Sequence, residues 1–238
     1  MDSATFSERT WSRRQILTCE VAVVLMLTSC RQFANGIATK FSSHRVSSVP
    51  TLAEAPAILK IIMGLGTLAV VFFLVYRTGD ISKFPSLKLN WIWDPPLALL
   101  LIVLNCVPML VFLEASRYSG VVFSPLLPSS SYHGPSGIII TTEVLAALVS
   151  TASVAYLITW YLMTRLGELL PIKIGAWAVC TIAWVMWEKP QSLIEFLLWT
   201  SWAMIFLGSF NKTHRTAPIA MALFATQVVG ILKVARIT

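Results

Sequence analysis

Charged residues are scarce in this chain. They make up 12% of its 238 residues, whereas a soluble globular domain carries about 25%. Hydrophobic residues reach 56%, and so few polar side chains cannot cover a surface that faces water. The shortage of charge excludes a soluble enzyme or a DNA-binding domain, and the many aromatic residues exclude a disordered chain. We therefore expect a protein that folds in a lipid bilayer.

Histidine and cysteine are also rare. The chain has three histidines and four cysteines. The histidines lie outside the long apolar runs, and the cysteines show no C-x-x-C spacing. A metal or haem site needs a set of such ligands, and a disulfide framework needs regularly spaced cysteines. We expect no metal and no cofactor, and cysteines that pack as small apolar residues.

The formal net charge of +7 does not arise from a basic patch. Lysine and arginine occur in ones and twos between apolar runs, as in loops that anchor membrane spans. Without a patch, no nucleic-acid partner is expected. Arg165 and Lys173 are assigned to one of these loops. A small excess of basic residues in the N-terminal tail and the loops on its side favours a cytoplasmic N-terminus.

Long apolar runs predict the fold class. A helix needs roughly 20 mostly apolar residues to cross the hydrocarbon layer, and lipid excludes irregular backbone. We predict an all-α, polytopic transmembrane helical bundle of about seven spans over residues 16–238, preceded by a polar tail at 1–15. The predicted spans are 16–37, 52–76, 95–113, 137–163, 169–187, 191–210 and 216–235.

Polar residues inside or beside these runs are the candidate site. Ionisable groups within a membrane are costly and usually face a cavity or a partner. We expect Lys60 to face a cavity or another helix, and Glu114 to pair with Arg117 at i, i+3. No catalytic residue is predicted. The substrate-binding candidates are Glu54, Lys60, Asn105, Glu114, Arg117 and Glu143.

Two further features of the spans concern packing. Glu20 lies within the first run, where it either lines a cavity or hydrogen-bonds a neighbouring helix. The fourth run carries small residues at three- and four-residue spacing, which lets helices approach closely. These are Ala146, Ala147, Ser150, Thr151 and Val154.

Several polar landmarks, taken in order, resemble those of the nucleotide-sugar transporters of the drug/metabolite transporter superfamily. Ala53-Glu54 with Leu59-Lys60 is similar to the family's second helix, and Thr78-Gly79 to the loop that follows it. Residues 107–127, 148–156 and 202–209 resemble later helices. With seven spans in place of the usual ten, the chain resembles a divergent or truncated member.

This resemblance implies an antiporter of the Golgi or endoplasmic reticulum that exchanges a nucleotide sugar for a nucleoside monophosphate. Lys60 and Arg117 would then face the phosphates. The expected partners are the lipid bilayer and a small-molecule substrate, and self-association into a homo-oligomer stays open.

Two alternatives remain at this point. The small seven-span terpene cyclases are similar to this chain in length and span count. Enzymes of that kind use a buried carboxyl as an acid, a role open to Glu54, Glu114 or Glu143. A non-catalytic accessory membrane protein is the other alternative, because fold class does not determine function.

Overall fold

The computed structural model describes residues 12–43, 55–79, 89–119, 137–188, 190 and 192–237. These residues form an all-α bundle with no strand among them, as the sequence predicts. Seven helices run along the long axis, one of them divided into three parts. The elements are α1 (Arg13–Ser43), α3 (Ala55–Arg77), α4 (Asp94–Ser119), α5 (Gly137–Val154), η2 (Ala155–Leu162), α6 (Met163–Leu169), α7 (Lys173–Glu188), α8 (Leu193–Thr213) and α9 (Ala217–Ile237).

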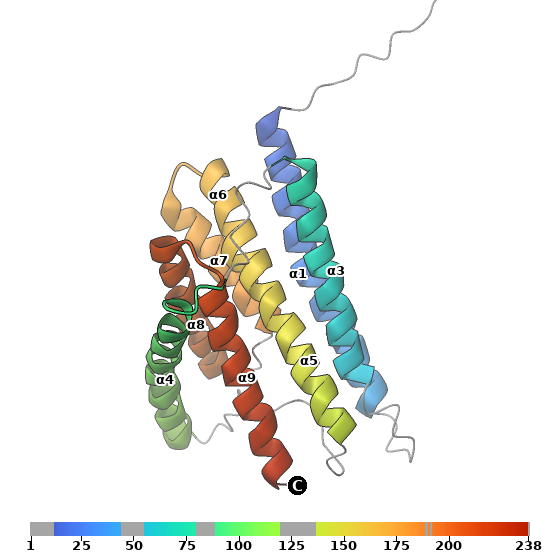
Figure 1. The fold of residues 1–238 in the computed structure, drawn as a ribbon, viewed down its shortest axis with the longest axis vertical. Coiled ribbons are helices and arrows are strands. Elements are labelled where there is room, and N and C mark those ends of the chain that lie inside the picture. The colour runs from blue at the N-terminus through green and yellow to red at the C-terminus, as the bar shows by residue number, and fades with distance from the viewer. Residues whose placement is uncertain are drawn as a thin grey trace, which may run out of the picture.

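Successive helices alternate in direction along the bundle. In Figure 1, α1 descends and α3 rises. The continuous helix α5–η2–α6, which follows α4 in the chain, also rises from the lower end to the upper end. The upper end therefore holds the starts of α1 and α7 and the ends of α3, α6 and α8.

One of the predicted substrate-binding residues, Glu54, lies outside the described residues.

The helices form a closed ring around η2. Neighbours around the ring are α1, α3, α5, α9, α4, α8, α7 and again α1. The segment η2 touches α1, α3, α7, α8 and α9, and all of its residues except Tyr156 are buried. Its i→i+5 hydrogen bonds make it a π-helix, a rare form that often occurs at functional sites. A helix that starts in the ring at α5 thus passes through the centre of the bundle at η2 and ends beside α1 and α7 at α6.

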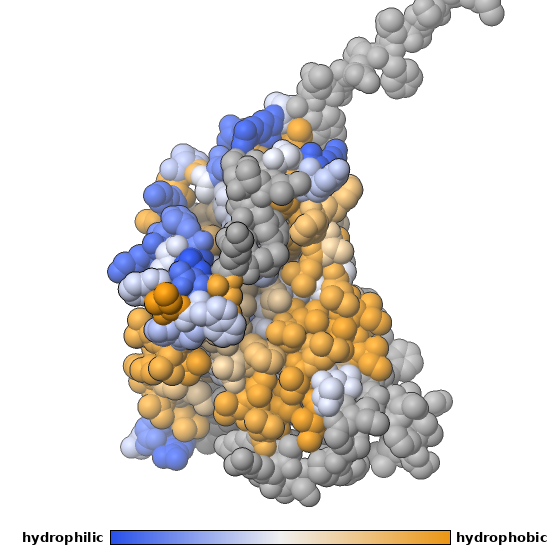
Figure 2. Space-filling model, viewed as in Figure 1, coloured by the Kyte–Doolittle hydropathy of each residue, from blue (hydrophilic) through white to orange (hydrophobic). Residues whose placement is uncertain are grey.

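The outer faces of the helices are strongly apolar. Within the described ranges, four helices are long and apolar enough to cross a membrane, at Ala57–Arg77, Asp94–Ala115, Ile140–Leu169 and Leu193–Thr213, and Ala217–Leu232 is a shorter apolar helix. Hydrophobic residues cover the lower part of the face in Figure 2, and hydrophilic ones gather near the end of α8. The helix α7 has 16 residues and extends about 24 Å, less than the hydrocarbon thickness.

The predicted boundary between the fourth and fifth spans was wrong. The fourth span was expected to end at residue 163, with Arg165 in the loop that follows, but the helix continues to Leu169. Polar residues there suggest a loop, yet this last part of the helix packs against α1 and α7, and Arg165 finds partners in Glu20 of α1 and in Thr78. Arg165 is consequently buried, at 4% exposure.

The small residues of the fourth run do allow close packing, as predicted. Ala146, Ala147 and Thr151 are buried in α5, which packs against α3 and α9. At the crossing with α3, the Ser153 hydroxyl donates hydrogen bonds to the carbonyl oxygens of Gly64 (3.0 Å) and Val149 (2.7 Å). A glycine is needed here because the two helices lie so close together.

We expect Gly64→Ala to lower the thermal stability of the protein. A Cβ at Gly64 would lie 2.5 Å from Val149 Cγ1 and 3.1 Å from Ser153 Oγ, and overpacking of this kind costs about 1–3 kcal/mol. Gly66→Ala is the matched control, because a Cβ there meets nothing within 4 Å. Thermal unfolding in detergent micelles, followed by tryptophan fluorescence, measures both. Equal melting temperatures for the two variants would contradict the close crossing.

Candidate functional site

A buried arginine lies where three helices meet. Arg165 belongs to α6, and its side chain is 5% exposed. Its Nε lies 3.2 Å from Oε2 of Glu20 on α1, a carboxylate that is equally buried. Its Nη2 donates a 3.0 Å hydrogen bond to Oγ1 of Thr78, just after the end of α3. One guanidinium thus links the continuous helix α5–η2–α6, which we call the central helix, to α1 and α3.

The π-helix contributes an aromatic residue to this arginine. The hydroxyl of Tyr161 donates a 2.8 Å hydrogen bond to Glu20 Oε2, and the Tyr161 ring centre lies 5.2 Å from the Arg165 guanidinium carbon. A cation over an aromatic face gains further electrostatic attraction. Of the two roles open to Glu20, these contacts support the hydrogen bond to a neighbouring helix.

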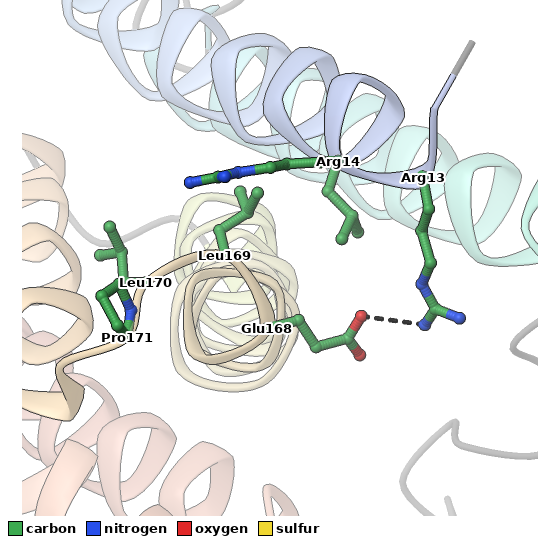
Figure 3. A pocket seen from close by; sticks show the side chains of 7 residues that line it. Arg13, Arg14, Glu168, Leu169, Leu170 and Pro171 are labelled. Atoms are coloured by element: carbon green, nitrogen blue, oxygen red, sulfur yellow. Dashed lines mark hydrogen bonds and ion pairs between the residues drawn. The ribbon is translucent and has the colours of Figure 1, made fainter.

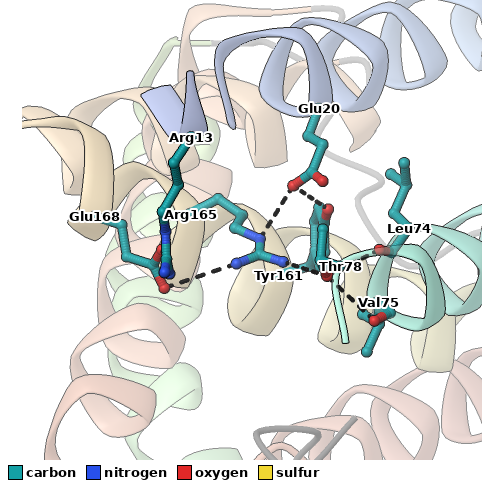
Figure 4. Close-up of polar contacts among 8 residues, drawn as sticks. All are labelled: Arg13, Glu20, Leu74, Val75, Thr78, Tyr161, Arg165 and Glu168. Carbon is teal, nitrogen blue, oxygen red and sulfur yellow. Dashed lines mark hydrogen bonds and ion pairs between the residues drawn. The ribbon is translucent and has the colours of Figure 1, made fainter. Parts of the chain in front are cut away.

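A second carboxylate extends the cluster to the protein surface. Glu168 Oε1 lies 3.7 Å from Arg165 Nη1, and Glu168 Oε2 lies 3.1 Å from Nη2 of the exposed Arg13. The order of charges is therefore Arg13, Glu168, Arg165, Glu20, from the end of the bundle into its interior (Figure 4). We call these four residues with Tyr161 and Thr78 the Arg165 cluster.

A hollow opens at the surface end of this cluster. Arg13, Arg14 and the buried Leu17 line it from α1, and Glu168 and Leu169 line it from α6. Leu170 and Pro171, between α6 and α7, complete its wall. In Figure 3, Arg13 points to Glu168, whereas Arg14 extends toward the side of Leu170 and Pro171. The hollow thus combines two guanidinium groups with several apolar side chains.

Lys60 has a partner on another helix, as one of its two predicted roles requires. Its Nζ lies 3.8 Å from Oε2 of Glu143 on α5. The Lys60 side chain is 30% exposed and that of Glu143 is 8% exposed. The pair lies near the start of α3, whereas Thr78 of the Arg165 cluster follows its end. The helix α3 is therefore joined to the central helix by polar contacts at both ends.

The other predicted candidates lie apart from this pair. Glu114 and Arg117 form the expected i, i+3 ion pair at 3.1 Å, with both side chains largely exposed. Asn105 is buried in α4, and its backbone oxygen accepts a 3.1 Å hydrogen bond from Trp202 Nε1 of α8. Its Oδ1 has no partner within the described part of the chain. The described candidates are thus not brought together at one cavity.

Sequence reasoning missed another ion pair, between the starts of α4 and α9. Arg215 binds Asp94 with two hydrogen bonds, Nε to Oδ1 at 2.6 Å and Nη2 to Oδ2 at 2.7 Å. Asp94 is fully buried and also accepts from the backbone nitrogen of Asn90 at 2.8 Å. The hydrogen bonds to Asp94 raise the pKa of Arg215 above its usual value. Aspartate before two prolines is typical of a helix start and could have revealed this residue.

We expect Arg165→Gln and Glu20→Gln to destabilise the fold strongly. Loss of one partner from a buried ion pair leaves an uncompensated charge, which costs about 3–5 kcal/mol. For a chain of this size that corresponds to a melting temperature lower by on the order of 10 °C. Arg117→Gln breaks an exposed pair and should change stability by less than about 1 kcal/mol. Equal melting temperatures in micelles for Arg165→Gln and Arg117→Gln would contradict the assignment of Arg165 and Glu20 as a buried ion pair.

Arg215→Lys should lower the melting temperature although it preserves the charge. Lysine presents a point charge and cannot form the two parallel hydrogen bonds to Asp94 that the planar guanidinium forms. Arg117→Lys is the matched control, because Arg117 donates a single bond to Glu114 from an exposed position. The same thermal unfolding experiment tests both, and a native melting temperature for Arg215→Lys would argue against a structural role for the paired bonds.

Neither a metal-binding group nor a known family accounts for this arrangement among the described residues. The described residues contain no group of three or more His, Cys, Asp and Glu side chains that could hold a metal ion. No family model matches the sequence, and no curated protein or solved structure matches it. The assignment of function therefore rests on the Arg165 cluster and on the Lys60–Glu143 pair.

Proposed function

We propose that the protein is a multi-pass integral membrane protein that moves a small anionic metabolite across the bilayer. The apolar outer faces of α3 and α4 support insertion, because exposed side chains such as Ile62, Phe72, Val107 and Leu110 would contact acyl chains. All seven helices would then cross or enter the membrane. The short α7 would be accommodated among its neighbours in the bundle, as helices shorter than the bilayer are.

The observation that carries this proposal is the buried guanidinium of Arg165 on the central helix. Arginine stays charged in proteins and matches phosphate and carboxylate groups with paired hydrogen bonds. Ionisable residues inside a membrane commonly mark the path of a substrate. In the arrangement described here Glu20 and Glu168 bind Arg165. A substrate phosphate would replace one of these carboxylates during transport.

The second cation that supports the proposal is Lys60. Its pairing with Glu143 repeats the same arrangement near the opposite end of α3, a basic side chain held by a carboxylate of a neighbouring helix. An anion that passed along the interface of α3 with the central helix would meet Lys60 and Arg165 in turn. This two-level arrangement suits alternating access, in which one end opens while the other stays closed.

The nucleotide-sugar class of substrate rests on the sequence resemblance, which includes Lys60 and Thr78. An endomembrane location would follow from the same resemblance. The embedded-enzyme alternative draws no support from Glu143, because its carboxylate pairs with Lys60 of α3, whereas the acid of a cyclase must face the substrate. Glu114 is exposed and paired with Arg117, so it suits the role of a buried catalytic acid no better.

Uptake into proteoliposomes tests this function. Purified protein is reconstituted with internal nucleoside monophosphate and challenged with a panel of labelled nucleotide sugars. We expect saturable exchange that is abolished by Lys60→Ala and reduced at least tenfold by Arg165→Lys, since lysine cannot bind phosphate through two parallel bonds. Lys212→Gln, at the exposed end of α8, is the control that should retain exchange.

Folding is checked separately for each variant by gel filtration and melting temperature. If Arg165→Lys does not fold, the less buried Lys60→Ala still decides the question. Folded wild-type protein that exchanges none of the nucleotide sugars would overturn the proposed substrate class. Normal exchange by folded Lys60→Ala would overturn the role of that lysine.

A further inference from the structure

From the hollow beside Arg13 and Arg14 we infer a binding site for the headgroup of an anionic phospholipid. This inference rests on the membrane insertion proposed above but not on transport. Arg13 and Arg14 are both exposed in the first turn of α1. Arg13 is held by Glu168, whereas Arg14 has no ion-pair partner among the described residues. Two guanidinium groups at one hollow favour an anion with several oxygen atoms.

The remaining wall of the hollow indicates an amphipathic ligand. Leu169, Leu170 and Pro171 present apolar surface next to the two arginines (Figure 3), and Leu17 also lines the hollow. A free inorganic anion would gain nothing from these side chains. A phospholipid would place its phosphate on the guanidinium groups and its glycerol and upper acyl carbons on the leucines.

The position of the hollow fits the membrane surface that carries anionic lipid. Basic side chains at this end of the bundle include Arg77 at the end of α3, Lys173 at the start of α7 and Lys212 at the end of α8. The positive-inside rule assigns such an end to the cytoplasmic side. Anionic lipids concentrate in the cytoplasmic leaflet and attract basic residues near the membrane surface.

Glu168 gives the site a property that a merely basic surface would lack. Its carboxylate lies 3.1 Å from Arg13 and also approaches Arg165. A lipid phosphate on Arg13 would compete with this carboxylate and experience its repulsion. Removal of the charge at Glu168 should therefore strengthen lipid binding, whereas removal of the arginines weakens it.

Native mass spectrometry of the full chain in detergent tests the site. The protein is titrated with phosphatidylglycerol and with phosphatidylcholine of the same acyl chains. We expect preferential retention of phosphatidylglycerol, weakened about fivefold by Arg13→Gln or by Arg14→Gln, given about 1 kcal/mol for each basic residue. Glu168→Gln should increase retention, and Lys212→Gln is the control for a basic residue of the same end outside the hollow.

Several outcomes would overturn the inference. These are equal retention of the two lipids, unchanged retention in the folded Arg13→Gln and Arg14→Gln variants, an equal loss in Lys212→Gln, and weaker retention in Glu168→Gln. Displacement of phosphatidylglycerol by equimolar inorganic phosphate would assign the site to a free anion and reject the lipid. Because the assay requires no transport, a failure here leaves the exchange experiment unaffected, and a failure of exchange leaves this result standing.

Discussion

The burial of one positive charge inside the bundle constrains much of the structure. A guanidinium cannot be neutralised at ordinary pH, so its position inside apolar surroundings requires partners on every side. Arg165 has Glu20 from α1, Thr78 from the end of α3, and Tyr161 and Glu168 from its own helix. These contacts determine how α1 and α3 are placed against the central helix.

Polar contacts and close backbone approach join two other helix pairs as well. In lipid, apolar side chains gain little from leaving the acyl chains, so small residues and hydrogen bonds decide which helices associate. The Gly64–Ser153 crossing and the Lys60–Glu143 pair join α3 to α5, and the Asp94–Arg215 pair joins α4 to α9. Each contact joins two segments that are far apart in the sequence. Two neighbouring pairs of the ring, α3 with α5 and α4 with α9, are thus joined by specific connections in addition to the hydrophobic core.

The candidate site was only partly predictable from sequence. Lys60 could be recognised because a lysine inside an apolar run needs a partner wherever the run packs, and Glu114 with Arg117 because i, i+3 spacing fixes their proximity. Arg165 follows the last strongly apolar residues of its run, so it was assigned to a loop. The role of Arg165 depends on which helices pack against the end of the central helix, and no periodicity within one helix reveals those neighbours.

Composition and hydrophobic run length alone determined that this chain forms an all-α bundle with strongly apolar helices, because backbone in an apolar environment must satisfy its hydrogen bonds within each helix. They also set the approximate bounds of seven helices. Only the tertiary structure decided the ring order, the π-helical segment at its centre and the partner of each charge. Those features arise from contacts between residues far apart in sequence, whose geometry depends on how whole helices pack.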